Sequence, residues 1–344
     1  MSDPAAIAAA IHTLAAAEGF VRVGFAAVQP LETEGARLDA WLGQGRHAEM
    51  AWMQRSRDAR LDPRLLLPGA ATVAVLAMPY GHPRPDDPQG LTGEVSRYAW
   101  GRDYHNGVGK ALRRMQRELR VRFPSLGGYT SVDSRPVYER AWAVRAGLGF
   151  AGRSCSTILP GQGTWVFLAT LVLDVALPES PTLDADCGSC ARCLQACPTG
   201  ALVAPGRLDA RRCLSYLTIE HRGEIPEDLR PAMGRRVFGC DVCQDTCPHN
   251  AKHRAAHPDY APRAGHAWLD LPALLREDDD ALERRLEGSP LRRARATGLK
   301  RNAAVVLGNI GDPAALPALA VAGGHPDPVV RSHAAWAAQR CGQG

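Results

Sequence analysis

The sequence predicts an α+β protein built from several domains, and three observations lead to this prediction. In the first 180 or so residues, helical patterns alternate with short apolar runs that are typical of covered strands. Two cysteine runs follow between residues 187 and 248, and from about residue 271 the pattern is helical. We therefore expect a mixed α/β domain at 1–180, a cysteine-rich domain at 181–255 and a helical domain at 265–344.

The first domain is expected to hold a mixed sheet flanked by helices. Its expected helices cover residues 5–18, 38–60 and 110–122, and its expected strands cover residues 20–26, 71–78 and 164–174. The run ATVAVLAM at 71–78 is apolar without a break and is closed by Pro79, which is typical of a covered central strand. The helix at 110–122 is basic and amphipathic, and the stretch 81–90 is a loop rich in proline and aspartate.

The cysteine-rich domain contains the spacing of an iron-sulfur protein. Cys187, Cys190, Cys193 and Cys197 precede Pro198, which is the C-x2-C-x2-C-x3-C-P run of bacterial two-cluster ferredoxins. A second run repeats the last three cysteines of this spacing, and Val237 stands where its first cysteine would fall. In such ferredoxins the fourth cysteine of each run binds the other cluster. The predicted ligands are therefore Cys187, Cys190, Cys193 and Cys247 for one [4Fe-4S] cluster, and Cys197, Cys213, Cys240 and Cys243 for the other.

Other uses of these cysteines fit the pattern less well. A zinc site is the main alternative, but zinc ligands usually occur as separated C-x2-C pairs. A disulfide framework is typical of short secreted chains, whereas this chain has 344 residues. Cys155 and Cys341 lie outside both runs, and we expect them to be ordinary small buried or tail residues.

The last part of the chain contains a short repeat. The segments RNAAVVLG at 301–308 and RSHAAWAA at 331–338 lie thirty residues apart and match in their small and apolar positions. This is typical of HEAT-like stacked helices, which with so few units must pack on a neighbouring domain. Just before them lies a basic run: Arg284, Arg285, Arg292, Arg293, Arg295, Lys300 and Arg301. Such a run is either a solvated helix face or a surface for a polyanion such as RNA.

The composition is that of an ordinary globular protein, with 45% hydrophobic and 22% charged residues. A net charge of +5 permits an anionic partner without requiring one. The N-terminus lacks the basic segment of a secretory signal, and no window approaches the ~18 apolar residues of a membrane span. We expect a monomeric cytoplasmic protein that does not enter a membrane.

Four further motifs carry a resemblance to a known family: SRYAWGRDYH at 96–105, VDSRPVYER at 132–140, AGLGFAG at 146–152 and CPTGAL at 197–202. Together with the two cysteine runs and the HEAT-like tail, they make the chain closely similar to the epoxyqueuosine reductases over nearly its whole length. The resemblance implies an oxidoreductase that removes the epoxide oxygen of epoxyqueuosine at the wobble position of tRNA. It also implies a cobalamin as the reactive cofactor, with electrons from an unidentified donor passing through the two clusters.

The resemblance further implies roles for particular residues. Asp133 would be the proton donor, although an aspartate before Pro136 is also a good helix N-cap, and the acid role would require a raised pKa. The cobalamin signature D-x-H-x-x-G is incomplete, because Val108 follows Asp103 and His105 where glycine is needed. We therefore expect cobalamin to bind without a histidine ligand to cobalt.

The candidate cobalamin-binding residues are Arg60, Ser96, Tyr98, Trp100, Asp133, Thr157, Ser215 and Asp241. The candidate tRNA-binding residues are His221, Arg222 and the basic run at 284–301. The aromatic residues of the SRYAWGRDYH motif can equally be core residues, and His105 can be a hydrogen-bonded structural histidine.

Three other functions remain open at this point. A reductive dehalogenase would use the same cofactors on a carbon-halogen bond. A two-cluster electron carrier would leave the first 180 residues without a role, and a HEAT-type RNA-binding scaffold would bind tRNA without catalysis.

Overall fold

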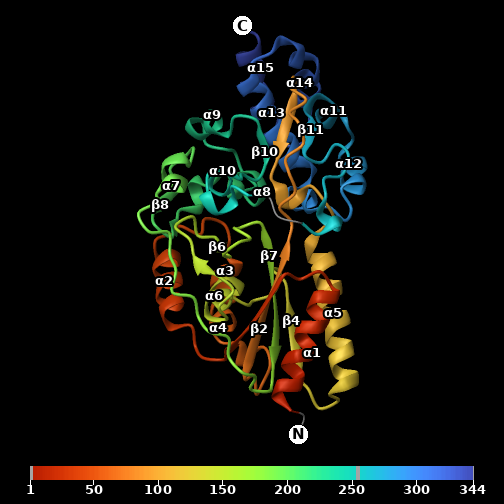
Figure 1. The fold of residues 1–344 in the computed structure, drawn as a ribbon. Coiled ribbons are helices and arrows are strands. Elements are labelled where there is room, and N and C mark those ends of the chain that lie inside the picture. The colour runs from red at the N-terminus through yellow and green to blue at the C-terminus, as the bar shows by residue number, and fades with distance from the viewer. Residues whose placement is uncertain (1–2, 253–255, 344) are drawn as a thin grey trace.

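The computed structural model describes residues 3–252 and 256–343 of the chain. Two halves are stacked along the long axis of the molecule, with the N-terminus at the bottom and the C-terminus at the top of Figure 1. The lower half holds the larger sheet, and the upper half holds the cysteine-rich segment and the C-terminal helices. None of the described helices is long and apolar enough to cross a membrane.

The lower half is organised on a four-stranded antiparallel sheet of order β1-β2-β7-β4. Its strands are β1 (Arg22–Ala27), β2 (Thr72–Pro79), β7 (Val166–Leu173) and β4 (Gly128–Ser131). The three strands predicted from the sequence are confirmed, but the prediction of a mixed sheet is wrong here, because all three pairings are antiparallel. Every residue of β2 is buried, because successive side chains point to opposite faces and both faces are covered. Ala74, Leu76 and Met78 enter one core, and Val73 and Val75 enter another.

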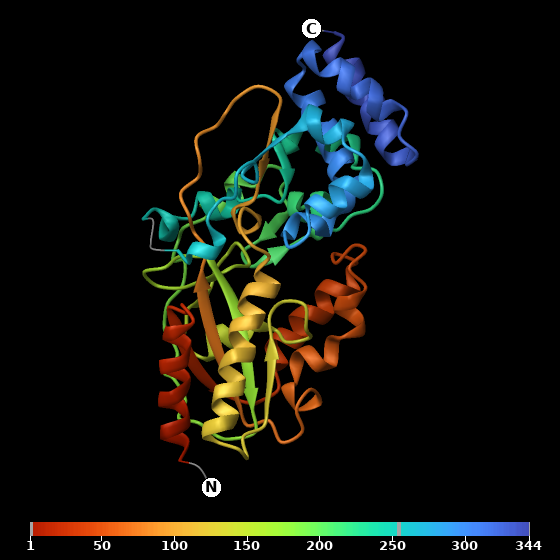
Figure 2. The same ribbon diagram turned by 90° about the vertical axis from the view of Figure 1, so that its right-hand side faces the viewer.

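Helices cover both faces of this sheet. α1 (Pro4–Ala17) and α5 (Tyr104–Arg122) cover one face, as Figure 2 shows, and α6 (Glu139–Arg145) buries Trp142 against the other. The prediction of one helix at 38–60 is wrong, because turns at 44–51 interrupt it. Three helices occupy this region: α2 (Glu32–Gly43), α3 (Trp52–Arg55) and α4 (Arg57–Leu61).

A second sheet joins segments that are far apart in the sequence. β3 (Thr92–Val95) lies between β10 (Arg236–Phe238), which is parallel to it, and β11 (Trp268–Asp270), which is antiparallel. The chain therefore leaves the lower half after β2, enters the upper half and returns at α5. For this reason the predicted domain at 1–180 is not one continuous unit.

The cysteine-rich segment, together with the strand pair that comes just before β7, forms short elements. They are the β5 (Phe150–Ala151) and β6 (Thr157–Ile158) pair, α7 (Arg192–Ala196), the β8 (Leu202–Ala204) and β9 (Arg207–Leu208) pair, α8 (Leu214–Ile219), α9 (Arg230–Met233) and α10 (Val242–Asp245). Three 3-10 turns lie within the cysteine-rich segment: Ala210–Arg212, Glu227–Leu229 and Pro248–Asn250. Two more, Pro63–Leu65 and Arg97–Ala99, lie earlier in the chain. A further turn, Pro258–Tyr260, precedes β11.

The C-terminal part is helical. Its elements are α11 (Leu271–Arg276), α12 (Asp279–Arg285), the 3-10 helix η7 (Pro290–Ala294), α13 (Arg295–Ile310), the 3-10 turn Pro313–Ala315, α14 (Leu316–Gly323) and α15 (Pro328–Cys341). α13 is the central helix of this part, since residues 298–308 are buried. Its Arg301 donates hydrogen bonds to the carbonyl oxygens of Leu217, His221 and Gly223 and so ties the C-terminal helices to α8.

Candidate functional site

Asp133 lies in the loop that follows β4, at the top of the lower sheet. Its Oδ2 accepts hydrogen bonds from the Tyr104 hydroxyl at 2.7 Å and from His105 Nε2 at 3.0 Å. The other ring nitrogen of His105, Nδ1, lies 2.8 Å from Asp103 Oδ1. Tyr104 and His105 stand in the first turn of α5. Asp103 caps this helix, because its side chain accepts a hydrogen bond from the backbone N–H of His105. The start of one helix therefore positions the groups around one carboxylate.

Glu139, the first residue of α6, supports the Asp133 loop from below. Its Oε1 accepts from the backbone N–H of Asp133 at 2.9 Å and from Ser131 Oγ at 3.0 Å. Asp133 has a φ of 49°, a left-handed conformation that non-glycine residues rarely adopt. α6 begins only at Glu139 after Tyr138, so Asp133 is not the helix cap that the sequence offered as an alternative. Its side chain is 64% exposed and open to a substrate.

The protonation states differ from the prediction. Desolvation raises the pKa of Asp133, but the hydrogen bonds from His105 and Tyr104 and the charge of His105 outweigh it and lower that pKa to about 2. Desolvation lowers the pKa of His105, but its bonds to Asp103 and Asp133 raise it to about 9. Asp133 therefore does not have, in this structure, the raised pKa that an acid role of its own would require. At neutral pH the proton of this pair lies on His105.

The structure brings the seven cysteines of the two runs, together with Cys213, into two groups. The thiol of Cys247 lies within electrostatic range of Cys187 and Cys190, which also act on Cys193. The thiol of Cys243 lies within range of Cys240, Cys213 and Cys197. α7 and α10, which follow the two runs, pack against each other. The neighbours within each group belong to one of the two predicted ligand sets, and the assignment of each cysteine to a cluster stays a prediction.

The donor chemistry of both groups fits iron-sulfur clusters. Burial raises the pKa of the Cys213 thiol, and it raises the pKa of Cys240 to about 12. Buried thiolates need a compensating positive charge, which iron supplies. In the part of the chain that the structure describes, no three His, Cys, Asp or Glu side chains are arranged to hold a single ion. In a [4Fe-4S] cluster each thiolate binds a different iron.

Comparisons with known proteins agree with this geometry. A family model described as a 4Fe-4S double cluster binding domain matches residues 186–250, and one described as epoxyqueuosine reductase QueG, DUF1730 matches residues 60–134. The epoxyqueuosine reductase of Xanthomonas campestris pv. campestris is 42% identical over 97% of this chain and 96% of its own length. The chain belongs to the epoxyqueuosine reductase family. It therefore carries two [4Fe-4S] clusters, and the zinc alternative is set aside.

Other members of the epoxyqueuosine reductase family show the same relation. The Escherichia coli enzyme is 39% identical over 93% of this chain and 85% of its own length. A crystal structure of an epoxyqueuosine reductase with an epoxyqueuosine-modified tRNA-Tyr stem loop superposes with a TM-score of 0.93 at 30% identity, covering 99% of this chain and 91% of that one. The structure from Streptococcus thermophilus gives a TM-score of 0.89 at 26% identity, covering 97% of this chain and 90% of that one.

The candidate cobalamin residues fall into two classes. Arg60, Tyr98 and Ser215 are half-buried and retain accessible surface. Trp100 is fully buried and donates its Nε1–H to the Val95 carbonyl, so of the two roles left open by the sequence it has that of a core residue. Three other candidates also serve the core: Thr157 is buried, and the hydroxyl of Ser96 donates to the buried carboxylate of Asp241. A pattern of residue types does not reveal which aromatic side chains turn inward.

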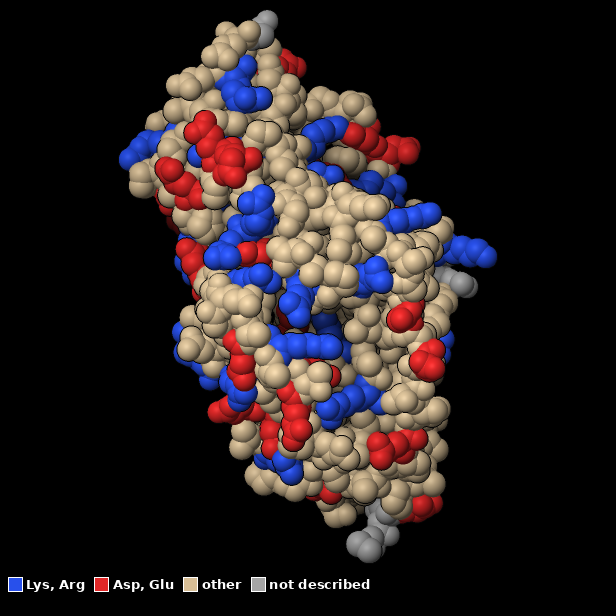
Figure 3. All heavy atoms as spheres, turned by 90° about the vertical axis from the view of Figure 1, so that its left-hand side faces the viewer, with Lys and Arg blue, Asp and Glu red and all other residues tan. Residues whose placement is uncertain are grey.

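Two residues to which the sequence analysis gave no functional role, Arg140 and Cys155, connect the carboxylate with the thiol groups. Arg140 acts electrostatically on Asp133, and its guanidinium donates to the Cys155 carbonyl at 2.8 Å. Cys155, with a φ of 66°, lies within electrostatic range of Cys193 and Cys213, one from each thiol group. Asp133 and the clusters therefore share one region of the molecule. Figure 3 shows basic side chains gathered round a hollow at mid-height on the left-hand face, where the two halves meet.

The predicted tRNA-contacting residues also fall into two classes, those that are exposed and those that are buried or bonded within the protein. Five of them are exposed: Arg284 and Arg285 on α12, Arg292 and Arg293 on η7, and Arg295 at the start of α13. Lys300 and Arg301 are buried, Lys300 being paired with Asp279 at 2.6 Å, so their assignment to tRNA contact is wrong. The helix packs these two positions inward, although the run of charges continues through them. His221 is held by Glu49 and the Glu224 carbonyl, and Arg222 donates to the carbonyls of Ile219, Arg293 and Ala294.

Arg293 stands at the mouth of the site, within electrostatic range of Asp133. Its guanidinium pairs with Glu220 at 2.7 Å and lies 5.4 Å from the ring centre of Trp52 on α3. Trp52 was not singled out in the sequence. The contact places α3 of the lower half against η7 of the upper half beside the carboxylate.

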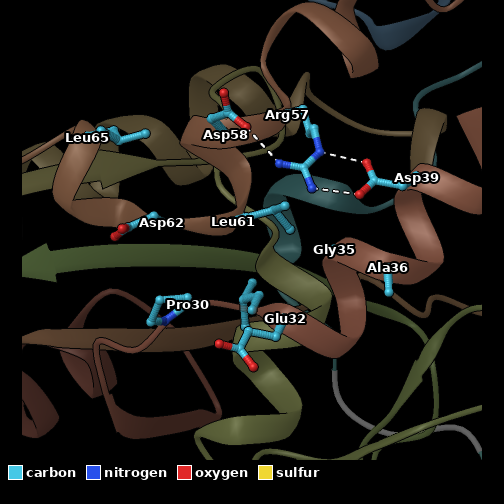
Figure 4. Close-up of a pocket in the computed structure, with 11 residues that line it drawn as sticks. Pro30, Glu32, Gly35, Ala36, Asp39, Arg57, Asp58, Leu61, Asp62 and Leu65 are labelled. Carbon is cyan, nitrogen blue, oxygen red and sulfur yellow. Dashed lines mark hydrogen bonds and ion pairs between the residues drawn. The ribbon is translucent and has the colours of Figure 1, made fainter.

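A separate groove of about 510 Å³ lies between α2 and α4 (Figure 4). Arg57 crosses it, pairing with Asp39 at 2.6 Å and Asp58 at 2.7 Å. The groove contains neither Asp133 nor a cluster cysteine.

Proposed function

We propose that this protein reduces epoxyqueuosine to queuosine at the wobble position of tRNA, with electrons passing through the two [4Fe-4S] clusters. The observation that carries the proposal is a solvent-open carboxylate, hydrogen-bonded to a protonated histidine and sharing one region with two four-thiol groups. The full-length similarity to epoxyqueuosine reductases supports it, as does the fold shared with one bound to a modified tRNA stem loop.

The reaction needs two electrons and two protons, because the epoxide oxygen leaves as water and the two ring carbons become an alkene. The clusters deliver electrons one at a time. Cobalamin, which the family resemblance implies, would supply a strongly reducing metal centre between the clusters and the substrate. The half-buried Arg60, Tyr98 and Ser215 fit this group as a cation, an aromatic face and a hydroxyl. The Tyr98 ring lies 6.1 Å from the ring of Tyr104, and the Ser215 hydroxyl donates to the carbonyl of Cys240.

The chain's own residues supply the acid chemistry. His105 Nε2 holds a proton that is shared with Asp133 Oδ2 across a 3.0 Å hydrogen bond. Asp133 relays that proton from His105 to the leaving oxygen as the carbon-oxygen bond breaks, and the neutral His105 then takes a new proton from water. Tyr104 and Glu139 fix the carboxylate and the loop that carries it. The second proton comes from water, to which Asp133 is open.

We also propose that residues 265–344 form a HEAT-like unit that contacts tRNA through the exposed arginines of α12 and η7. In support, α13 and α15 pack against each other and carry the two matched segments of the repeat. The protein is proposed to act as a monomer with a separate electron donor.

The test is an anaerobic turnover assay on tRNA carrying epoxyqueuosine, with cobalamin and a chemical reductant, followed by mass spectrometry of the nucleosides. We expect the modified nucleoside to lose one oxygen atom only when cobalamin is present, and Asp133→Asn to abolish this loss. An unchanged nucleoside from protein whose clusters are intact and reducible would reject the proposal.

A further inference from the structure

The outer face of α5 is strongly basic. Lys110, Arg113, Arg117 and Arg120 are exposed and follow each other at three- or four-residue spacing, so they form one row along the helix. Leu112, Met115 and Leu119 lie on the opposite face and are buried. From Lys110 to Arg120 the row extends about 15 Å at ~1.5 Å per residue.

Packing within the protein does not account for this row. Its neighbour Arg114 pairs with Glu18 of the segment after α1, but within the described residues no carboxylate pairs with Lys110, Arg113, Arg117 or Arg120. Like charges at this spacing destabilise a helix by about 0.2–0.5 kcal/mol per pair. Repulsion within the row therefore slightly destabilises α5 in the free protein, and an anionic partner would relieve this repulsion.

The row leads to the candidate active site. α5 begins with Tyr104 and His105, whose side chains bond Asp133. The backbone N–H of Asp103 donates to the carbonyl of Gly288 at 2.9 Å, in the turn between α12 and η7. That turn joins the helices that carry the exposed Arg284 and Arg292. Two basic segments from opposite ends of the sequence thus meet beside one carboxylate.

We propose that the outer face of α5 binds the phosphate backbone of the RNA whose modified nucleotide reaches Asp133. The proposal rests on the proposed function and adds a surface to it. RNA would then be held on both sides of the reacting nucleotide, by α12 and η7 above and by α5 below. Regularly spaced cations facing a polyanion give affinity through counterion release, independently of sequence.

The position of α5 also argues that its basic row is not the docking site of the electron donor. A donor protein must approach the clusters, which lie near α7 and α10, and α7 lies at the left edge of Figure 1. α5 lies on the right of that view, on the other side of the molecule from α7, and faces the viewer in Figure 2.

The test compares two fourfold variants of the full-length, cluster-loaded protein. The first is K110Q/R113Q/R117Q/R120Q. The matched control, R37Q/R192Q/R207Q/K252Q, removes the same charge from exposed positions on α2, α7, β9 and the segment after Pro248–Asn250. The dissociation constant of a tRNA-Tyr anticodon stem-loop carrying epoxyqueuosine is measured against salt concentration, and kcat and KM are measured on the same RNA.

We expect the α5 variant to bind at least about tenfold more weakly at moderate salt, with a salt slope smaller by about 0.7–0.9 for each phosphate that the variant no longer neutralises. Its kcat at saturating RNA should be unchanged, because His105 and Asp133 are intact, and the control should bind like wild type. Unchanged affinity in the α5 variant overturns the proposal, as does an equal loss of affinity in the control. A fall in kcat at unchanged affinity overturns it too.

Slower cluster reduction by an acidic flavodoxin, with RNA binding intact, would assign the row to a protein donor instead and likewise overturn it. If wild type binds the stem-loop without turning it over, the proposed function fails while the binding comparison still decides the role of α5.

Discussion

Replacing Asp103 by asparagine tests whether His105 is the proton store of the site. Asparagine caps a helix as well as aspartate does, so α5 should keep its first turn. What the variant lacks is one of the two carboxylates that raise the pKa of His105 from 6.5 to about 9. The two carboxylates lie 2.8 and 3.0 Å from the ring nitrogens. Removing one of them should lower the pKa of His105.

The sign of the effect follows from the raised pKa. His105 is protonated below its pKa and loses its proton as the pH rises through about 9 in wild type. With its lowered pKa, the variant should match wild type near pH 7 but fall roughly several-fold below it at pH 9, where wild-type His105 is still about half protonated. The assay is kcat/KM on the modified stem-loop from pH 6.5 to 9.5, with wild type and Asp133→Asn run beside it. An equal loss at pH 7 and pH 9, or no loss at either, would refute the role of His105.

Three further outcomes follow from the interactions described above. Cys213→Ser should retain about half of the iron and lose turnover, whereas Cys341→Ser should keep both, as iron analysis and the assay would show. Glu139→Ala should lower kcat by roughly ten- to a hundredfold with little change in stem-loop affinity, because it frees the Asp133 loop; an unchanged kcat would contradict this. Arg301→Met should destabilise the protein by about 3 kcal/mol, seen as a lower thermal midpoint, and leave the RNA affinity of the folded protein unaltered; weaker binding would restore Arg301 to the interface.

Local spacing carried much of the prediction. The two groups of thiols follow from distances along the chain, because cluster ligands recur within a few residues of each other. The strands at β2 and β7 follow from unbroken apolar runs, since both faces of the sheet are covered. Asp133 was found through its motif rather than through its chemistry.

What the sequence could not predict depends on contacts between distant segments. The pKa of Asp133 is set by His105 on α5, twenty-eight residues away along the chain. Trp100 and Arg301 stand in motifs that suggest function, yet packing turns both inward. Trp52 meets Arg293 only because the two halves come together, so no local pattern marks it. Burial and pairing of this kind belong to the tertiary fold.

The second sheet has a consequence for how the protein is made. β3 is synthesised early, but both of its neighbours, β10 and β11, leave the ribosome much later. Until then β3 has two open edges, which in a nascent chain are sites for wrong pairing. All eight thiols of the two groups precede β11, so they emerge before the sheet that fastens the upper half can close. The thiols are therefore available for cluster insertion before β11 has been synthesised. At that stage β3 still lacks one of its two partner strands.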